Sequence, residues 1–380
     1  MQVLVDATAL GSGLGGDETM LRGLLSGLAV TAEPDDRIDV LAPAEALLPV
    51  DARRHPQVHL RATSHLPGAA HFGARLPSLL RRWPGARPDA VVTVTHAPAS
   101  SAVPVAVMVQ DLSFHHHPEH YPRAARARLR TLVPRQARRA AAVLTVSEHA
   151  RAEFIAPYDL DPGRVHHVPN VVARPPVLDD HQVAAARAHL AALGAEGPSL
   201  LYLGNLHPRK NVAAAIRAFT AARAGTPALA DHRLVIAGAR WWGAGEERAV
   251  AEAAPGSVVL LGRVDDVEKE VLLRDARALV YVSLFEGFGL PPLEAMARST
   301  PVVAARATSL PEVCGDAAVL VDPHDVDDIA AGIVAVLTDD DVADRCVAAG
   351  HGRAAAYRPE RTGAALRHAL ASVPTAAVAS

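Results

Sequence analysis

Short apolar runs rich in β-branched residues alternate with longer helical patterns along the whole chain, and turn residues separate them. We expect strands near residues 3–6, 39–42, 58–61, 90–94, 105–109 and 143–146, and then near residues 199–203, 234–237, 258–261, 278–282, 301–304 and 318–321. Continuous apolar strands of this kind are buried on both faces, so the alternation indicates parallel sheets with helices on both sides. The predicted fold class is α/β, with doubly wound, Rossmann-like parallel sheets.

The length of the chain indicates more than one domain. At 380 residues it exceeds what one ordinary hydrophobic core supports. Prolines and adjacent acidic residues interrupt the periodic pattern between Val168 and Asp180, which is typical of a connection between domains. We therefore predict an N-terminal domain over residues 1–175, a C-terminal domain over residues 176–358, and a final helix with a mobile tail over residues 359–380.

Charge and cysteine content exclude several classes of protein. A formal net charge of -3 gives no global reason to expect a nucleic-acid partner, so any anion is bound locally. Cys314 and Cys346 are the only cysteines and lie far apart, which indicates neither a disulfide framework nor a zinc site. Met1 leads directly into strand-like residues, and no run has the length and purity of a membrane span. We expect a cytoplasmic protein that is neither exported nor transmembrane.

The most informative segment runs from Ser283 to Ala297 and reads as a strand end, a glycine loop and a helix. Gly287 and Gly289 allow the backbone to approach a ligand, and proline is expected at the first helical position. A helix N-terminus presents unpaired N–H groups and a favourable dipole, so a diphosphate is expected there without a metal ion. Glu294 is expected in the first helical turn, where its carboxylate can accept hydrogen bonds from ribose hydroxyls, and Glu286 can do the same for a sugar.

A second segment, Gly204 to Asn211, follows the first strand of the C-terminal half and is expected to open a helix near Arg209. Lys210 and Lys269 are the only lysines in the chain, so a lysine at this position is notable. Arg209 and Lys210 together offer a planar fork and a point charge to phosphate oxygens. The pair is expected to stabilise the negative charge of a departing nucleoside diphosphate.

These residues resemble the large retaining glycosyltransferase family with the GT-B fold that is usually called family 4. Glu286 and Glu294 match its E-x7-E motif, and Arg209 and Lys210 match its diphosphate-binding pair. Gly262–Val264 looks like the family's nucleobase loop. Four further stretches also resemble the family: Thr300–Ala304, Leu310–Val313, Gln110–Phe114 and Val146–Glu148. The resemblance covers nearly the whole chain.

The resemblance implies two sheets that face each other across a cleft, with the donor on the C-terminal domain, the acceptor on the N-terminal domain and the final helix crossing back. It implies a hexosyltransferase that uses a nucleoside diphosphate sugar as co-substrate, keeps the anomeric configuration and needs neither a cofactor nor a metal. The acceptor is expected to be a saccharide, a natural product or a cell-envelope component. The implied catalytic residues are Glu286, Arg209, Lys210 and Gln110; the donor-binding residues are Glu294, Gly287, Phe288, Gly289, Leu290, Gly204, Asn205, Arg263 and Val264; and the acceptor and phosphate loop contains Gly15, Gly16, Asp17 and Asp111.

Two positions depart from the family pattern. Gln110 stands where the family commonly has histidine, and an amide forms hydrogen bonds but cannot carry a proton. The glycine loop continues with Asp17 and Glu18, which are expected to face a hydroxyl-rich or cationic acceptor. Gln110 leaves open a non-catalytic, sugar-nucleotide-binding partner protein as an alternative function.

A second alternative is an NAD-dependent oxidoreductase, because Gly11–Gly16 matches a G-x-G-x-x-G fingerprint. The fingerprint should follow its strand directly and an acidic residue should end the next strand, and neither condition holds here. Histidines also gather at His115–His117 and His120, where we expect a loop that lines the cleft rather than a metal site.

The stretch from Arg123 to Arg139 carries seven arginines and is expected to be a solvated helix face. A weak contact with an anionic membrane or acceptor is the alternative. The role of the neighbouring pair Trp241 and Trp242, in the core or on a cleft wall, stays open.

Overall fold

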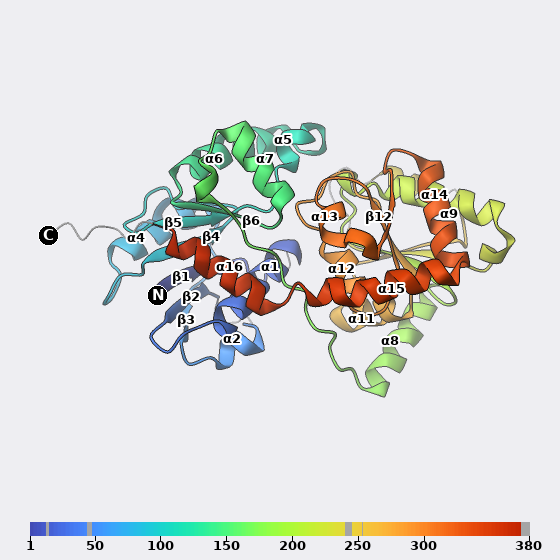
Figure 1. Ribbon diagram of the computed structural model, residues 1–380, viewed down its shortest axis with the longest axis horizontal. Coiled ribbons are helices and arrows are strands. Elements are labelled where there is room, and N and C mark those ends of the chain that lie inside the picture. The colour runs from blue at the N-terminus through green and yellow to red at the C-terminus, as the bar shows by residue number, and fades with distance from the viewer. Residues whose placement is uncertain (13–14, 44–47, 240–244, 253, 374–380) are drawn as a thin grey trace. The chain divides into compact units, whose positions relative to one another are not determined.

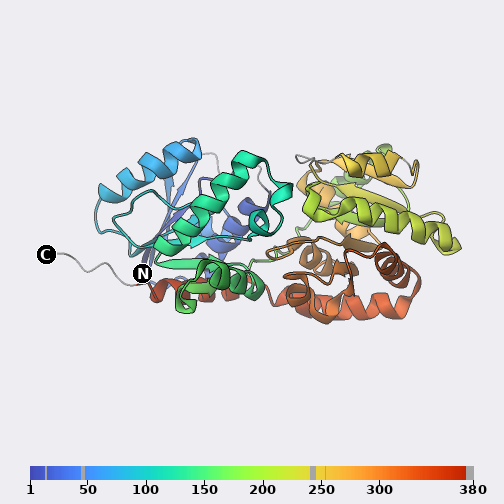
Figure 2. The same ribbon diagram turned by 90° about the horizontal axis from the view of Figure 1, so that it is seen from above.

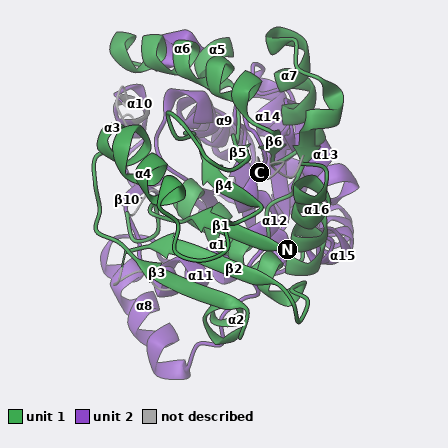
Figure 3. Ribbon diagram, turned by 90° about the vertical axis from the view of Figure 1, so that its left-hand side faces the viewer, with its two compact units in different colours: residues 1–116, 121–171, 357–380 green, residues 117–120, 172–356 purple. Residues whose placement is uncertain are grey.

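The computed structural model describes residues 1–12, 15–43, 48–239, 245–252 and 254–373. The pattern of contacts divides these residues into two compact units. Unit 1 contains residues 1–116, 121–171 and the C-terminal residues from Tyr357 on, and unit 2 contains residues 117–120 and 172–356 (Figure 3). Residues 168–179, predicted as the connection, carry neither helix nor strand, and the division falls between Val171 and Val172.

Unit 1 is built on a seven-stranded parallel sheet in the order β3-β2-β1-β4-β5-β6-β7. Its strands are β1 (Gln2–Asp6), β2 (Arg37–Ala42), β3 (Val58–Ala62), β4 (Ala90–Val94), β5 (Val105–Met108), β6 (Ala142–Thr145) and β7 (Val165–His167). Its helices are α1 (Gly15–Val30), α2 (Val50–Arg54), α3 (Gly68–Ala70), α4 (Leu76–Arg81), α5 (Ser113–His116), α6 (Arg123–Arg139), α7 (Glu148–Tyr158) and α16 (Pro359–Ala371), with a π-helix at His71–Arg75 and a short 3-10 turn at Pro162–Arg164. The order reverses between β1 and β4, which is the topological switch point of a doubly wound sheet.

Helices cover both faces of this sheet, as Figures 1 and 2 show. One buried cluster lies beneath α6 and α7 and includes Val107, Phe154 and Tyr158, while another lies beneath α4 and includes Leu80 and Trp83. Val105 packs on the second cluster and Val107 belongs to the first, and these residues lie two positions apart on β5, so both clusters lie on the same face of the sheet. The strands also bury residues that point to the opposite face, such as Val3, Val5 and Val40, which explains why they read as continuous hydrophobic runs.

Unit 2 repeats the arrangement with a six-stranded parallel sheet in the order β10-β9-β8-β11-β12-β13. Its strands are β8 (Ser199–Leu203), β9 (Arg233–Ala237), β10 (Val258–Gly262), β11 (Ala278–Tyr281), β12 (Val302–Ala305) and β13 (Val319–Val321). Its helices are α8 (Asp180–Ala192), α9 (Val212–Gly225), α10 (Glu246–Glu252), α11 (Asp266–Asp275), α12 (Leu290–Met296), α13 (Leu310–Cys314), α14 (Val326–Thr338) and α15 (Asp340–Ala355), with 3-10 turns η2 (Pro118–His120), η4 (Pro208–Lys210), Pro227–Leu229 and Gly315–Ala317. The switch point lies between β8 and β11.

The predicted α/β class with two doubly wound parallel sheets is confirmed. Strand β7 was missed, because it has three residues and two of them are histidines. Several helices begin where the sequence supplies a cap: Ser147 accepts a hydrogen bond from the Ala150 amide at the start of α7, and Asp265 with Glu268 forms a capping box at the start of α11.

Helix α16 returns to unit 1 and packs on α1 through glycines. A Cβ atom on Gly363 would lie 2.1 Å from the carbonyl oxygen of Gly27, and one on Gly27 would lie 2.8 Å from the amide nitrogen of Gly363. The hydroxyl of Thr362 donates a buried hydrogen bond of 2.7 Å to the carbonyl oxygen of Pro169. The C-terminal helix is therefore an integral part of unit 1, at a crossing that only glycine permits.

This crossing predicts that Gly363→Ala destabilises the protein, since an added methyl group meets backbone atoms that have no room to move. Overpacking of this kind lowers the free energy of unfolding by about 1–3 kcal/mol. The matched control is Gly352→Ala in α15, where a Cβ atom meets nothing within 4 Å, so that variant should be neutral or slightly more stable. Thermal unfolding of both variants tests this, and equal midpoints would contradict the close packing of α1 and α16.

Candidate active site

The loop that carries Glu286 connects β11 to α12 and is held by the turn after β12. The backbone amide of Glu286 donates to the Thr308 hydroxyl at 3.0 Å. The buried Ser309 hydroxyl lies 2.9 Å from the carbonyl oxygens of both Glu286 and Phe288 and donates to them. These side chains fix the path of the loop, and the spacing of the motif residues gave no sign of their role.

The start of α12 differs from the prediction in two details. Leu290 is the first helical residue, and prolines occupy the second and third positions, where they bring no backbone N–H. Glu294 is the fifth residue of a seven-residue helix, so it lies beyond the first turn. Gly289 precedes the helix with φ of +107°, and a Cβ atom there would lie 2.5 Å from Leu310 Cδ2, which explains the glycine. Because α12 is short and its first turn has few N–H donors, most of the attraction for a phosphate must come from the charges of nearby side chains.

Those charges come from the 3-10 turn η4, which follows β8. The helix expected near Arg209 is α9, which begins at Val212. Arg209 and Lys210 lie in η4 before it, and Asn211 between them and α9 adopts the left-handed conformation with φ of +59°. The carbonyl oxygen of Arg209 accepts a 2.8 Å hydrogen bond from the amide of Leu284. This bond joins the loop after β8 to the loop after β11, across the switch point of the sheet.

A buried cluster of charges strengthens this junction. Arg209 Nη1 lies 2.9 Å from Glu286 Oε2 and 2.6 Å from the carbonyl oxygen of Phe285. Lys210 Nζ donates to Glu286 Oε1 and, at 2.7 Å, to the hydroxyl of Tyr281. The same hydroxyl donates to Glu286 Oε1 at 2.9 Å. Hydrogen bonds from three side chains therefore surround the carboxylate.

The ionisation states follow from this geometry. Burial alone would raise the pKa of Glu286, but the charges of Arg209 and Lys210 lower it to about 2. Burial and the nearby carboxylate raise the pKa of Tyr281 well above 10, so its hydroxyl stays protonated and donates. One carboxylate against two cations leaves a net single positive charge, which suits an anionic ligand.

The second glutamate of the motif has a parallel arrangement. Glu294 is buried, and its Oε1 accepts a 2.6 Å hydrogen bond from Nζ of Lys269 in α11. Arg298 donates to the backbone oxygen of Glu294 at 3.0 Å. Each of the chain's two lysines thus pairs with one glutamate of the E-x7-E motif. The scarcity of lysine could have marked Lys269 as a functional residue. The sequence did not indicate that it pairs with Glu294, because the two residues are 25 positions apart.

The remaining predicted donor residues lie at the same edge of the sheet of unit 2. Gly204 and Asn205 directly follow β8, and Arg263 and Val264 follow β10. Arg263 is exposed and Val264 is half-buried. Because all the strands are parallel, these residues meet at the carboxyl edge, where doubly wound sheets bind their ligands. Trp241 and Trp242 lie outside the described residues.

A separate polar group occupies the carboxyl edge of unit 1. Gly15 and Gly16 begin α1, and the side chain of Asp17 accepts a hydrogen bond from Nε2 of Gln110. Burial and the charge of Asp111 raise the pKa of Asp17, which Gln110 partly offsets. Asp111 Oδ1 accepts a 2.9 Å hydrogen bond from the amide of Ser113. The structure therefore brings Asp17, Gln110 and Asp111 together within unit 1.

Family models match both halves of the chain. One described as "Glycosyltransferase Family 4" matches residues 14–174, and one described as "Glycosyl transferases group 1" matches residues 191–353. Among the described residues, no helix is long and apolar enough to cross a membrane.

Several curated relatives carry mannosyltransferase names. The chain is 34% identical to O-antigen chain mannosyltransferase B of Escherichia coli over 245 residues, which is 60% of each protein. It is 35% identical to a phosphatidyl-myo-inositol mannosyltransferase of Mycolicibacterium smegmatis over 152 residues, which is 38% of this chain and 37% of that protein. The matches therefore span less than two thirds of these relatives.

Solved structures share the fold at low sequence identity. Sucrose-phosphate synthase from Thermosynechococcus elongatus aligns over 97% of this chain and 98% of its own, with a TM-score of 0.69 and 18% identity. Anabaena Alr3699/HepE in complex with UDP and glucose aligns over 98% of this chain and 100% of its own, with a TM-score of 0.69 and 16% identity.

The low pKa of Glu286 predicts a pH-dependent contribution to stability. Because the pKa in the folded protein lies below the ordinary value of 4.5, the stabilisation is complete above about pH 4.5 and is lost as the pH falls through about 2. A shift of this size corresponds to on the order of 3 kcal/mol at neutral pH. Urea unfolding of wild type and Glu286→Gln at pH 7 and pH 3 should show a stability difference that shrinks in acid; a difference independent of pH would contradict the ionised cluster.

Proposed function

Because the chain belongs to the GT-B glycosyltransferases of family 4, we propose that it is a retaining enzyme that moves a hexose-type sugar from a nucleoside diphosphate sugar to a hydroxyl-bearing acceptor. The observation that carries the proposal is the cluster of Arg209, Lys210 and Glu286 at the switch point of unit 2, with its net positive charge. A diphosphate beside this cluster would neutralise the excess charge. Gly287, Phe288, Gly289 and Leu290 would then line the donor.

The chemistry follows from leaving-group stabilisation. When the bond between the anomeric carbon and the phosphate oxygen breaks, negative charge grows on the nucleoside diphosphate, and preorganised cations stabilise it without reorganising. Glu286 keeps Arg209 and Lys210 in place and is itself fully ionised. In the proposed mechanism the acceptor hydroxyl attacks the anomeric carbon from the same face as the one the leaving group departs from. The donor phosphate assists removal of the proton from the acceptor hydroxyl, and no nucleophile from the protein takes part.

Glu294 is proposed to bind the ribose. A carboxylate can accept hydrogen bonds from two neighbouring hydroxyls. Lys269 occupies one of its oxygens and keeps the side chain oriented, so Lys269 would act as a positioning residue for the nucleotide. Arg263 and Val264 are proposed to flank the base.

The names of the relatives favour mannose as the transferred sugar. An O-antigen chain and phosphatidyl-myo-inositol both present hydroxyl groups, which supports a saccharide or cell-envelope acceptor. Asp17, Gln110 and Asp111 of unit 1 are proposed to contact this acceptor. A cytoplasmic location is part of the proposal.

The basic helix α6 adds a proposed contact with an anionic surface. Its exposed arginines are Arg123, Arg128, Arg130, Arg135, Arg138 and Arg139, and the helix carries no acidic residue. Such a face attracts anionic lipid headgroups or an anionic acceptor weakly and in a salt-dependent manner.

A nucleotide-binding partner protein without turnover is the second candidate, and Gln110 favours it. Its amide donates to Asp17 and cannot carry a proton. An NAD-dependent role has less support, since α1 begins at Gly15, well after the end of β1 at Asp6. Thermal shifts with UDP, GDP, dTDP and NAD separate the ligand classes, because a ligand that binds only the folded state raises the midpoint.

Turnover tests the enzyme directly. Lys210→Ala should reduce sugar transfer by about 10²- to 10³-fold, since one preorganised charge is lost from the leaving group. Lys210 is buried against Glu286, so circular dichroism must show that the variant is folded. Arg187→Ala, which removes an exposed cation paired with Asp275 in the same unit, is the control and should keep full activity. Nucleoside diphosphate binding by the wild type without consumption of any donor would leave only the partner-protein candidate.

The proposed mechanism also predicts that transfer needs no metal ion, because side-chain cations take the place of one at the diphosphate. Transfer should continue at an undiminished rate in EDTA. A loss of activity that added Mg²⁺ or Mn²⁺ restores would contradict this expectation.

A further inference from the structure

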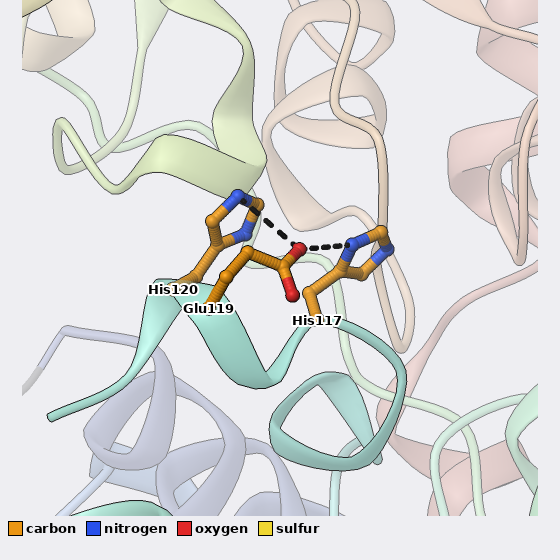
Figure 4. A group of neighbouring side chains, drawn as sticks. All are labelled: His117, Glu119 and His120. Atoms are coloured by element: carbon orange, nitrogen blue, oxygen red, sulfur yellow. Dashed lines mark hydrogen bonds and ion pairs between the residues drawn. The ribbon is translucent and has the colours of Figure 1, made fainter. Parts of the chain in front are cut away.

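Three side chains that the proposed transfer does not use lie together between α5 and α6. Figure 4 shows the side chains of His117, Glu119 and His120 pointing toward one another. Each presents one ligand atom, and these atoms all lie within 4.8 Å of one another. The two histidines are three positions apart: His117 immediately precedes η2 and His120 is its last residue, and the tight turn of a 3-10 helix aligns such residues. From the sequence, four histidines in this segment were expected to line a cleft rather than to bind a metal ion. In the structure His116 pairs with Glu153 and His115 packs against Tyr158, while Glu119 joins the other two.

The distances suit coordination of a metal ion. Glu119 Oε1 lies 3.3 Å from His117 Nδ1 and 3.7 Å from His120 Nε2. Two ligands bound at roughly 2.1 Å to a tetrahedral ion lie about 3.4 Å apart. The carboxylate oxygen and each imidazole nitrogen are therefore already near the separation that a shared ion requires.

The surroundings hold the two rings while leaving one side open. The rings of His117 and His120 are stacked, with centroids 5.3 Å apart and planes 9° apart. Within unit 2, His117 packs edge-on against Phe285 and His120 against His207. The Glu119 side chain is 61% exposed, so water can reach the cluster and complete a coordination shell.

We propose that His117, Glu119 and His120 bind one divalent transition-metal ion of the Zn²⁺ class, with water in the remaining position. Two imidazoles and one carboxylate favour Zn²⁺, Co²⁺ or Ni²⁺, whereas Mg²⁺ and Ca²⁺ prefer sites made only of oxygen atoms. The site supplies no group to the proposed transfer, in which Arg209 and Lys210 neutralise the diphosphate, but it adjoins them: His120 packs against His207, whose ring accepts a hydrogen bond from the Arg209 amide.

Metal titration of the full, untagged chain tests the proposal. Wild-type protein should bind one equivalent of Zn²⁺ by calorimetry, and Co²⁺ should give a visible absorption band typical of coordination by nitrogen and oxygen. The double variant His117→Ala, His120→Ala should lose this equivalent, and Glu119→Gln should weaken it by about tenfold or more. Mg²⁺ should give no heat at the same concentrations.

The control is His65→Ala, which removes an exposed histidine outside the cluster and should bind Zn²⁺ like the wild type. Circular dichroism and thermal melting check that all variants fold. Equal affinity and stoichiometry in wild type and in the double variant would place the ion elsewhere among the 19 histidines, and absence of Zn²⁺ binding in the wild type would likewise overturn the proposal.

Discussion

The buried carboxylate of Glu286 is the interaction on which the rest of the candidate site depends. It lies between two cations that follow β8, although the glutamate itself follows β11, so it joins the two sides of the switch point in unit 2. Taking three charges out of water costs free energy, and that cost is offset only when each charge is paired and hydrogen-bonded. Tyr281, buried beneath the loop, supplies the additional hydrogen bonds. The pairing therefore holds the cations in a position that flexible surface side chains would not keep.

The same principle organises the rest of the donor side. Lys269 pairs with Glu294 as Lys210 does with Glu286, so each motif glutamate arrives oriented by a lysine. Ser309 fixes the backbone between them. The short proline-containing helix α12 contributes few backbone donors, which shifts the binding of an anion from the helix dipole to side-chain charge. A rigid, net positive edge is well suited to a diphosphate leaving group.

Much of this could be predicted from the sequence because local patterns specify it. Buried parallel strands produce apolar runs wherever they are long enough, which identified β1 and β8 but not the three-residue, histidine-rich β7. The E-x7-E spacing identified Glu286 and Glu294 without the structure, but their partners could not be predicted. Tyr281 looks like any buried strand residue, and Lys269 is on another helix. The start of α9 at Val212 depends on the left-handed Asn211, a conformation that residue type alone does not determine.

In the proposed donor site, Lys210 is held by Glu286 and helps to bind the diphosphate of the donor. Calorimetry with a nucleoside diphosphate and the matching monophosphate, on wild type and on Lys210→Ala, tests it most directly. Wild-type protein should bind the diphosphate more tightly than the monophosphate, and Lys210→Ala should lose most of this preference, whereas Lys269→Met should weaken both ligands alike. An unchanged ratio of the two affinities in Lys210→Ala would contradict it.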